Sequence, residues 1–554
     1  MRKLKPDRFF KPVRFGIKIL QIIKFSFLNI KDNLLKTEEN RTIEIMDTTL
    51  RDGEQMQGVS YTPEEKLTIS KILLMEVKVD RIEVTSARVS EGEKKALQRM
   101  LNWAQQVDLV DRFEILSFVD KNKSVDWAKA IGVKRVNLLT KGSYKHCTEQ
   151  LRKTPEQHAQ DIRETVLYAT DNGIEVNVYL EDFSNGIKTS PDYLYNLIDF
   201  LLTLPVKRIM LPDTLGIFNP FETYEYISAI VTKYPLVHFD FHSHNDYGLG
   251  TANAMAAIKA GVKGIHATVN GMGERAGNAS LDEIVASIND FLPVNFNVEE
   301  KKLHTISQTV ETFSGVRMAN NKPIYGKNVF TQTAGIHADG DKKGNLYDNK
   351  LAPERFDRKR KYALGKLSGK ANLEMSLKEL AIELTEEEKQ VLLRKIIELG
   401  DQKEVVTTED LPFLIRDIFE TLDNWPFKLL SCSITSTYTL KPYAAIKCDY
   451  QGKMMDAYAQ GNGGYDAFMN ALREILKHFQ LPVPQLLDYE VTIPPGGHTD
   501  ALVQATISWQ IEQPNGRRCV MTTRGVNPDQ NMAAIEATVK MINMIIEKPE
   551  KQTE

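Results

Sequence analysis

The sequence predicts an α/β protein with a (β/α)8 TIM barrel, followed by helical linker subdomains and a C-terminal α/β domain. From residue 41 onward, β-rich runs alternate with segments of helical apolar spacing, which is typical of a parallel sheet with crossover helices. Eight such units fit into about 250 residues, the usual size of this barrel. In addition, acidic residues and histidines gather where the β-rich runs end, as active-site residues do in such barrels.

The expected strands cover residues 42–47, 81–85, 113–119, 134–139, 174–181, 207–213, 237–244 and 263–270. Segments between them, such as 62–77 and 221–234, carry Thr or Pro near their starts and repeat apolar residues at helical spacing. A doubly wound open sheet is the alternative architecture. No glycine-rich nucleotide-binding fingerprint follows the first strand, which favours the barrel.

The domain boundaries follow from changes in pattern. We expect the barrel over residues 41–310, helical linker subdomains with a glycine-rich polar loop (335–347) over 311–424, and the C-terminal domain over 425–548. The last segment reads as two successive units, each of two or three strands followed by a helix, a weak internal repeat that indicates a duplicated regulatory module. Gly461 and Gly525 are expected at matching strand-to-helix turns of the two units.

Residues 1–40 form a basic extension, with eight Lys/Arg and one Asp among the first 30 residues. Lys18 and Lys24 interrupt its apolar run, which is too short to span a bilayer and lacks the cleavage site of a secretory signal. We interpret the extension as a segment outside the fold, either disordered or upstream of the true start. A peripheral membrane or targeting helix is the alternative.

The composition is that of a globular protein: 42% hydrophobic residues, 26% charged residues and a net charge of −3. This balance gives no reason to expect nucleic acid or a membrane as a partner. The four cysteines, Cys147, Cys432, Cys448 and Cys519, are scattered and lack CxxC spacing. They indicate free thiols in a reducing cytoplasm.

A metal site is expected where the seventh strand ends. His242 and His244 lie two residues apart on a strand, so their side chains point to the same face. Barrel closure brings the first strand beside the eighth and thereby places Asp52 near this pair. Two histidines and a carboxylate can bind a divalent ion and leave positions open for a substrate. Asn278 is a weaker candidate ligand, and magnesium, manganese and zinc all remain open.

Such a site suits a Claisen-type condensation. A 2-oxo acid chelates a metal ion through its carboxylate and ketone oxygens, and Arg51 is placed to stabilise the alkoxide formed when a carbanion attacks the ketone. Glu181 ends the fifth strand and is the candidate base. His337, in the glycine-rich loop, is a candidate to relay or supply the proton.

Four motifs stand in a fixed order: DTTLRDGEQ (47–55), HSHNDYGLGTANAMAAIKAGV (242–262), NGMGERAGN (270–278) and GIHADGDKKGNLY (335–347). With them the chain resembles the acyl-CoA-condensing branch of the DRE-TIM metallolyases, which contains the 2-isopropylmalate, citramalate and homocitrate synthases. The resemblance covers nearly all of the chain from residue 41 onward. It implies a homodimeric, metal-dependent acyltransferase with acetyl-CoA as co-substrate.

Within this family, DRIEVTSARVSEGE, VNLLTKGSYKH and VNVYLEDFSNG resemble the citramalate synthases, which act on pyruvate in isoleucine biosynthesis. Isopropylmalate synthases carry a small serine where Tyr179 stands in this chain. Together with Leu116 and Leu139, Tyr179 would fill the room that an isopropyl group needs. The resemblance therefore implies that pyruvate fits best.

The resemblance also implies roles for individual residues. Asp52, His242 and His244 would ligate the metal ion, Arg51 would polarise the ketone, and Thr214 would bind the pyruvate carboxylate. Glu181 would generate the acetyl-CoA enolate together with His337, which the partner subunit would contribute. Asn345 and Tyr347 would lie near His337. For the C-terminal module, the family implies feedback by a branched-chain amino acid, isoleucine or leucine. The expected effector loops are 461–468 and 493–501, with Tyr465 as a contact.

Two alternatives remain. The first is a 2-isopropylmalate synthase, which condenses acetyl-CoA with 2-oxoisovalerate in leucine biosynthesis. The second is a non-catalytic amino-acid sensor built on an inactive barrel, which predicts the loss of metal or base residues. The sequence disfavours the sensor because it retains all of these residues: Arg51, Asp52, Glu181, His242, His244 and His337.

Overall fold

The structure is a computed structural model of the chain. It describes residues 41–332, 344, 346, 348–366, 368–380, 382–401, 406, 408–419, 425–493, 503–512 and 518–546. The chain divides into two compact units. The first contains the residues up to 330 together with 348–360, and the second contains the remainder.

The first unit is built on a closed barrel of eight parallel strands in sequence order, which confirms the predicted TIM barrel. The strands are β1 (Glu44–Asp47), β2 (Arg81–Ser86), β3 (Phe113–Phe118), β4 (Arg135–Lys141), β5 (Glu175–Glu181), β6 (Val206–Asp213), β7 (Phe239–Ser243) and β8 (Gly264–Ala267). β1 pairs with both β2 and β8, so the barrel closes through its first strand. β7 and β8 are shorter than expected: residues 237–238, 244, 263 and 268–270 lie outside them.

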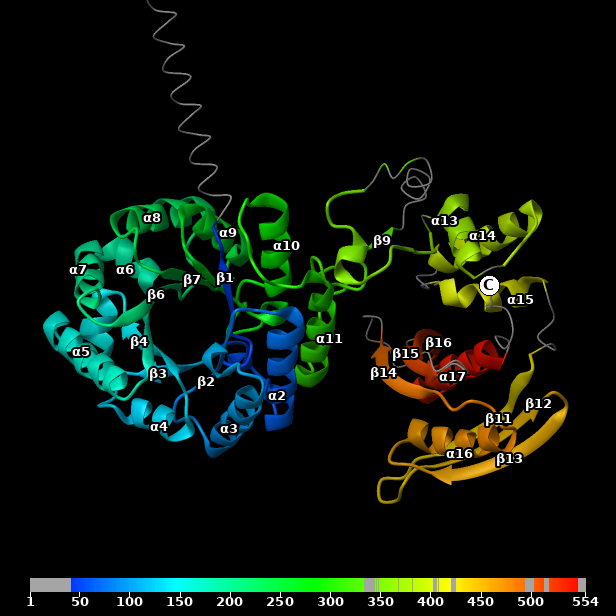
Figure 1. Ribbon diagram of the computed structural model, residues 1–554. Coiled ribbons are helices and arrows are strands. Elements are labelled where there is room, and N and C mark those ends of the chain that lie inside the picture. The colour runs from blue at the N-terminus through cyan, green and yellow to red at the C-terminus, as the bar shows by residue number, and fades with distance from the viewer. Residues whose placement is uncertain are drawn as a thin grey trace, which may run out of the picture. The chain divides into compact units, whose positions relative to one another are not determined.

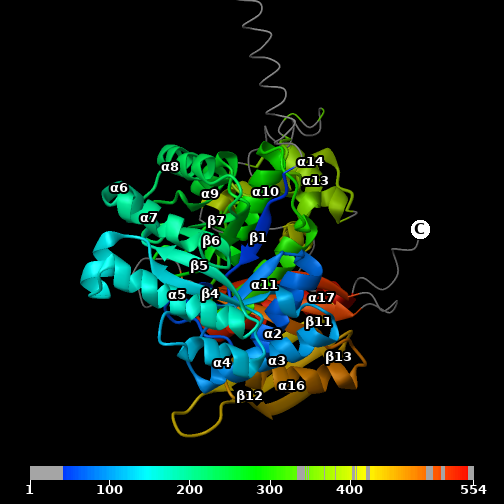
Figure 2. The same ribbon diagram turned by 60° about the vertical axis from the view of Figure 1, so that its left-hand side comes forward.

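Helices surround the strands, as Figure 1 and the turned view of Figure 2 show. They are α2 (Pro63–Lys71), α3 (Glu91–Gln106), α4 (Lys123–Ile131), α5 (Pro155–Asp171), α6 (Phe183–Thr189), α7 (Pro191–Leu201), α8 (Pro220–Lys233), α9 (Gly250–Ala260), α10 (Leu281–Phe291) and α11 (Leu303–Ser314). Capping boxes at Thr62, Thr154 and Asn219 start α2, α5 and α8. In each, a short polar side chain and the side chain three residues later satisfy two backbone N–H groups, which fixes where the helix begins.

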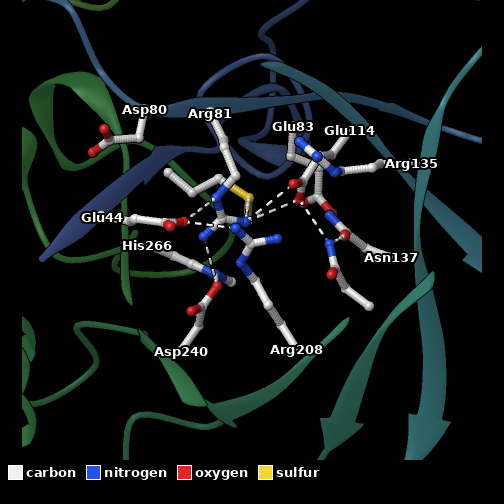
Figure 3. A network of polar contacts seen from close by, with 12 residues as sticks. Glu44, Asp80, Arg81, Glu83, Glu114, Arg135, Asn137, Arg208, Asp240 and His266 are labelled. Atoms are coloured by element: carbon white, nitrogen blue, oxygen red, sulfur yellow. Dashed lines mark hydrogen bonds and ion pairs between the residues drawn. The ribbon is translucent and has the colours of Figure 1, made fainter. Parts of the chain in front are cut away.

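Alternate residues of each strand point into the barrel. Near the amino ends of the strands this interior is charged: Arg81 is 2% exposed and forms ion pairs with Glu44, Glu114 and Asp240 (Figure 3). Closer to the carboxyl ends lies an apolar layer, whose members are Met46, Leu116, Tyr179 and Met210, with Phe118 and Leu139 packed against them. The interior is therefore layered along the barrel axis.

The second unit contains a small helical part and two antiparallel sheets. The helical part comprises β9 (Thr331–Gln332), β10 (Lys361–Tyr362), α13 (Lys370–Glu379), α14 (Glu386–Asp401) and α15 (Leu411–Phe419). The sheets and their helices are β11 (Phe427–Thr435), β12 (Tyr443–Tyr450), β13 (Lys453–Gln460), α16 (Gly464–His478), β14 (Gln485–Thr492), β15 (Val503–Glu512), β16 (Arg518–Asn527) and α17 (Gln530–Ile546). Each sheet has three strands in sequence order.

This order gives two successive β-β-β-α repeats, in agreement with the sequence pattern. The expected positions of the two glycines were only half right. Gly461 lies between β13 and α16, whereas Gly525 lies inside β16 rather than in a turn. Both nevertheless allow a close approach of the following helix, because a Cβ would lie 2.2 Å from Ala467 N at Gly461 and 2.0 Å from Ala533 O at Gly525.

Among the described residues, no helix is long and apolar enough to cross a membrane. Cys147, Cys432 and Cys448 are free thiols, as expected from their scattered positions. The basic extension (1–40) and the side chain of Cys519 lie outside the described part of the chain.

Candidate active site

The loop after β1 carries Arg51 and Asp52 to the carboxyl ends of the strands. The carbonyl oxygen of Thr48 accepts hydrogen bonds from the backbone N–H groups of Arg51 (3.1 Å) and Asp52 (2.8 Å). Asp47 binds the backbone N–H (2.9 Å) and the hydroxyl (3.0 Å) of Thr49. Asp47 therefore stabilises the turn after β1, and this turn places Asp52 at the carboxyl ends of the strands.

Asp52, His242 and His244 come together at these strand ends, with one potential ligand atom of each lying within 4.8 Å of the others. His242 Nε2 lies 3.2 Å from Asp52 Oδ2 and 3.4 Å from His244 Nε2. All three side chains are buried. The residues meet because β8 pairs with β7 on one side and with β1 on the other.

Electrostatics favours a cation between these three side chains. Burial alone would raise the pKa of Asp52, but Arg51 and the two imidazoles outweigh it and hold this pKa well below its usual range. Burial lowers the pKa of His242 despite the nearby Asp52, and burial together with His242 lowers the pKa of His244 to about 4. At neutral pH the set is one carboxylate and two neutral imidazoles, which fits a divalent metal ion.

Asn278 is also near this set. It pairs with His244 in an isolated antiparallel bridge, and its Nδ2 donates a hydrogen bond to Met272 O (2.9 Å). Its Oδ1 is buried and has no hydrogen-bond partner within the described structure, and the same holds for Asp52 Oδ1. Because buried oxygens are rarely left without a partner, both are available to a bound ion or to its water.

Arg51 is held rigidly beside Asp52. Its Nε donates to Glu83 Oε2 (2.5 Å) and its Nη1 to Asp52 Oδ2 (3.0 Å). Glu83 is fully buried and also accepts a hydrogen bond from Asn137 Nδ2 (2.7 Å). These bonds use two sides of the guanidinium and leave Nη2 as the donor for a ligand.

The three residues expected to set the size of the substrate, Leu116, Leu139 and Tyr179, belong to one apolar layer in the barrel. The Tyr179 ring is 3% exposed and packs edge-on against His242, with 6.3 Å between ring centroids. The guanidinium carbon of Arg51 lies 6.0 Å from the centre of the same ring. The structure thus brings the predicted size-determining residues next to the predicted metal and ketone groups.

Glu181 and Thr214 lie at neighbouring strand ends. Glu181 is the last residue of β5 and forms an ion pair with Lys141, the last residue of β4 and its partner in the sheet register. The Thr214 hydroxyl oxygen accepts a hydrogen bond from the backbone N–H of Asp182 (2.9 Å). Asp182 adopts a left-handed conformation (φ 64°) that turns the chain out of β5.

His158, in α5, stabilises the carboxyl end of β4. It is 1% exposed, and its Nε2 accepts a hydrogen bond from the backbone N–H of Lys141 (3.2 Å). A nitrogen that accepts this bond must be unprotonated, and burial lowers the pKa of His158 to about 4.

We therefore expect the stability of the protein to depend on pH through His158. The unfolded chain takes up a proton near pH 6.5, whereas the folded chain does so only near pH 4, so the free energy of unfolding falls as pH decreases through this window, by roughly 3 kcal/mol at its lower end. Urea denaturation at pH 7 and pH 5 measures this loss. In His158→Gln, whose amide oxygen can accept the same bond, the loss should be smaller by about 2 kcal/mol at pH 5. Equal pH dependence of the two proteins would contradict the assignment.

The remaining predicted residues either lie outside the described part of the chain or belong to the second unit. His337, Asn345 and Tyr347 lie outside the described residues. Tyr465 belongs to the second unit, where its hydroxyl is 2.7 Å from Thr538 Oγ1 and its ring is 5.2 Å from that of Tyr489. Apart from residue 493, the expected effector loop 493–501 also lies outside the described residues.

Sequence reasoning missed two charged residues of the site, Glu83 and Lys141. A signal existed for each. Glu83 stands two residues after Arg81 on a strand, so both point into the barrel, and a buried carboxylate there needs a cation. Lys141 follows the fourth predicted strand, and parallel register places it beside Glu181.

Comparison with known proteins gives three matches to family models. Residues 42–310 match the HMGL-like family, 324–404 the homocitrate synthase post-HMGL domain-like family, and 405–546 the LeuA allosteric (dimerisation) domain. The first match covers the barrel, the second covers α13 and α14 of the helical part, and the third covers α15 and the two sheets with their helices.

Relatives of similar length carry two names. The chain is 32% identical to a candidate (R)-citramalate synthase (CimA) of Methanopyrus kandleri, over 91% of this chain and 96% of that protein. It is 34% identical to a candidate 2-isopropylmalate synthase of the same organism, over 91% and 98%. It is 31% identical to the 2-isopropylmalate synthase of Methanocaldococcus jannaschii, over 92% and 95%. The chain therefore belongs to the family of citramalate and 2-isopropylmalate synthases, acyltransferases with an HMGL-like barrel and a LeuA allosteric (dimerisation) domain.

Proposed function

We propose that this enzyme condenses acetyl-CoA with pyruvate and, with the consumption of one water molecule, releases (R)-citramalate and coenzyme A, as a step toward isoleucine. The observation that supports pyruvate is the apolar layer beside Arg51 and His242. Tyr179, Leu116 and Leu139 are bulky side chains in this layer, and they favour a methyl group over an isopropyl group next to the ketone.

Asp52, His242 and His244 would hold a divalent ion, magnesium, manganese or zinc, with Asn278 as a weaker ligand. Such an ion polarises the ketone of the 2-oxo acid as a Lewis acid. Arg51 Nη2 donates to the ketone oxygen and stabilises the negative charge that develops on it. The bonds to Glu83 and Asp52 hold the guanidinium in place before the reaction, so little reorganisation is needed.

Glu181 takes a proton from the methyl group of acetyl-CoA, and the resulting enolate carbon attacks C2 of pyruvate. Lys141 orients the Glu181 carboxylate through their ion pair. Because Thr214 Oγ1 already accepts a bond from Asp182, its hydroxyl proton is available to the pyruvate carboxylate. His337 of the partner subunit is proposed to relay or supply the proton that the resulting alkoxide takes up, and Asn345 and Tyr347 are proposed to assist it. Water then hydrolyses the thioester.

The regulatory part of the proposal concerns the second unit. The match of residues 405–546 to a LeuA allosteric (dimerisation) domain supports a homodimer with feedback by a branched-chain amino acid, isoleucine or leucine. Tyr465 stands at the start of α16 and is proposed to contact the effector. We also propose a cytoplasmic location, which the substrates and the free thiols support.

A coenzyme A release assay tests the substrate. We expect a higher kcat/KM with pyruvate than with 2-oxobutyrate, and the lowest value with 2-oxoisovalerate. Repeating the assay with isoleucine and with leucine tests the regulation. A preference for 2-oxoisovalerate would overturn the proposal in favour of a 2-isopropylmalate synthase, the name that several relatives carry.

Tyr179→Ser should shift this preference. Removing the ring opens space in the apolar layer, so kcat/KM for 2-oxoisovalerate should rise and that for pyruvate should fall, with a combined change in their ratio of about 10- to 100-fold. Steady-state kinetics with both substrates measure the ratio. An unchanged ratio in a folded variant would exclude Tyr179 from the substrate pocket.

A further inference from the structure

A chain of polar side chains crosses the barrel interior beneath the candidate metal site. Arg81 Nη2 donates to Asp240 Oδ2 (2.7 Å), His266 Nε2 lies 3.1 Å from the same oxygen, and His266 Nδ1 lies 3.1 Å from the Tyr179 hydroxyl. Figure 3 shows His266 and Asp240 beside Arg81 in this network. All four side chains are 3% exposed or less. The chain ends at the residue that is proposed to limit the size of the substrate.

Hydrogen-bond chemistry sets the direction of each bond. A carboxylate oxygen can only accept, so His266 Nε2 carries the proton of the bond to Asp240. In the tautomer with its proton on Nε2, the imidazole accepts at Nδ1, and the Tyr179 hydroxyl donates its proton to that nitrogen. The Tyr179 hydroxyl therefore has no proton left to donate to the substrate. Its ring acts on the substrate only by occupying space.

The packing leaves the Asp240 carboxylate little freedom. A Cβ on Gly264 would lie 2.1 Å from Asp240 Oδ1, so this glycine provides the space for the carboxylate. The Tyr179 ring packs edge-on against His266, with 5.6 Å between centroids, as well as against His242. A tyrosine held at its ring and at its hydroxyl has one position, whereas a tyrosine held at its ring alone can tilt away from a larger substrate.

We propose that Asp240 and His266 are positioning residues that fix Tyr179 in the orientation that admits pyruvate and excludes larger 2-oxo acids. This inference rests on the proposed function. Neither residue touches the substrate. They act on specificity through the Tyr179 hydroxyl, and their loss lets the ring move and widens the space beside the ketone.

The test uses the full-length protein and the kcat/KM ratio for pyruvate over 2-oxobutyrate, which is larger by one methylene. His266→Ala should lower this ratio by about tenfold, mainly through a lower KM for 2-oxobutyrate, because one methylene in a pocket is worth about 10-fold or more. His266→Gln should restore most of the ratio, since a glutamine can donate to Asp240 and accept from Tyr179. Tyr179→Phe removes the hydroxyl and keeps the ring, and it should lower the ratio in the same direction as His266→Ala.

His238 provides a matched control. Its Nε2 lies 3.0 Å from the other oxygen of the same carboxylate, Asp240 Oδ1, but His238 stands at the amino end of β7 and is not in the chain that reaches Tyr179. His238→Ala should leave the substrate ratio unchanged. In the Tyr179→Phe background, His266→Ala should no longer change the ratio, because the two residues act through one bond.

The outcomes separate this inference from the proposed function. If the wild-type enzyme prefers 2-oxoisovalerate, the proposed function is wrong, and the inference falls with it. If the wild type prefers pyruvate but Tyr179→Phe keeps its ratio, the inference alone is overturned. The same holds if folded His266→Ala keeps the ratio or if His238→Ala lowers it equally. If circular dichroism shows that His266→Ala does not fold, the substrate ratio of Tyr179→Phe tests the inference instead.

Discussion

Replacing Asp52 with alanine is expected to lower kcat/KM for the condensation by at least about 10³-fold, since a metal ion supplies several kcal/mol of charge stabilisation. Asp52 is the one carboxylate of the three-residue set in the described structure. Without it, two neutral imidazoles face the positive charge of Arg51, which repels a cation. Metal content after dialysis, measured by mass spectrometry, should fall together with the rate of coenzyme A release.

Asp47→Asn is the matched control for this prediction. Asp47 is a buried aspartate on the same segment, but it binds Thr49 rather than the metal set. Burial raises its pKa to about 7, against the bonds from Thr49, so the uncharged amide resembles a form that the native residue already adopts. The control should keep its metal and most of its activity. Metal retained by Asp52→Ala would contradict the ligand assignment.

Replacing Arg51 with lysine is expected to lower kcat/KM by about 10²- to 10³-fold, as the loss of one placed donor to a developing oxyanion does. Lysine keeps the positive charge between Asp52 and Glu83 but cannot bind both carboxylates and still point a donor at the ketone. Since the charge is conserved, the metal content should change little. This combination of lost activity and retained metal distinguishes Arg51 from Asp52.

Arg135→Lys makes the same chemical change at the opposite end of the barrel. Arg135 begins β4, forms an ion pair with Glu175, and is remote from the carboxyl ends of the strands. Its replacement should leave the rate of coenzyme A release unchanged. An Arg51→Lys variant that keeps activity within about threefold of wild type would remove Arg51 from the mechanism that we propose.

The barrel was predictable because its signals are local. Apolar periodicity marks each strand and helix, and caps such as Thr62 and Asn219 fix where helices begin. The errors concern where strands end. β7 ends one residue before His244, which pairs with Asn278 instead, and Gly525 serves a strand-to-helix contact from inside a strand.

The active site was partly predictable from the positions of its residues along the strands. Residues at the ends of parallel strands must meet at one mouth of the barrel, so Asp52, His242 and His244 could be placed together from their strand positions. The side chains that bind and orient these reactive residues could not be predicted from strand positions. Glu83 reaches Arg51 from another strand, and the bond from His266 to Tyr179 depends on how two inward side chains meet across the barrel.

By itself, the sequence determined the order of elements, the residues at the strand ends and the chemistry that those residue types can perform. The tertiary structure decided which charges are paired, which nitrogen of His266 donates, and how a charged layer and an apolar layer stack beneath the site. The physical reason is that periodicity is a property of neighbouring residues in the chain. Hydrogen-bond direction and ion pairing depend on barrel closure and on burial, which bring together side chains from distant strands and remove water from around them.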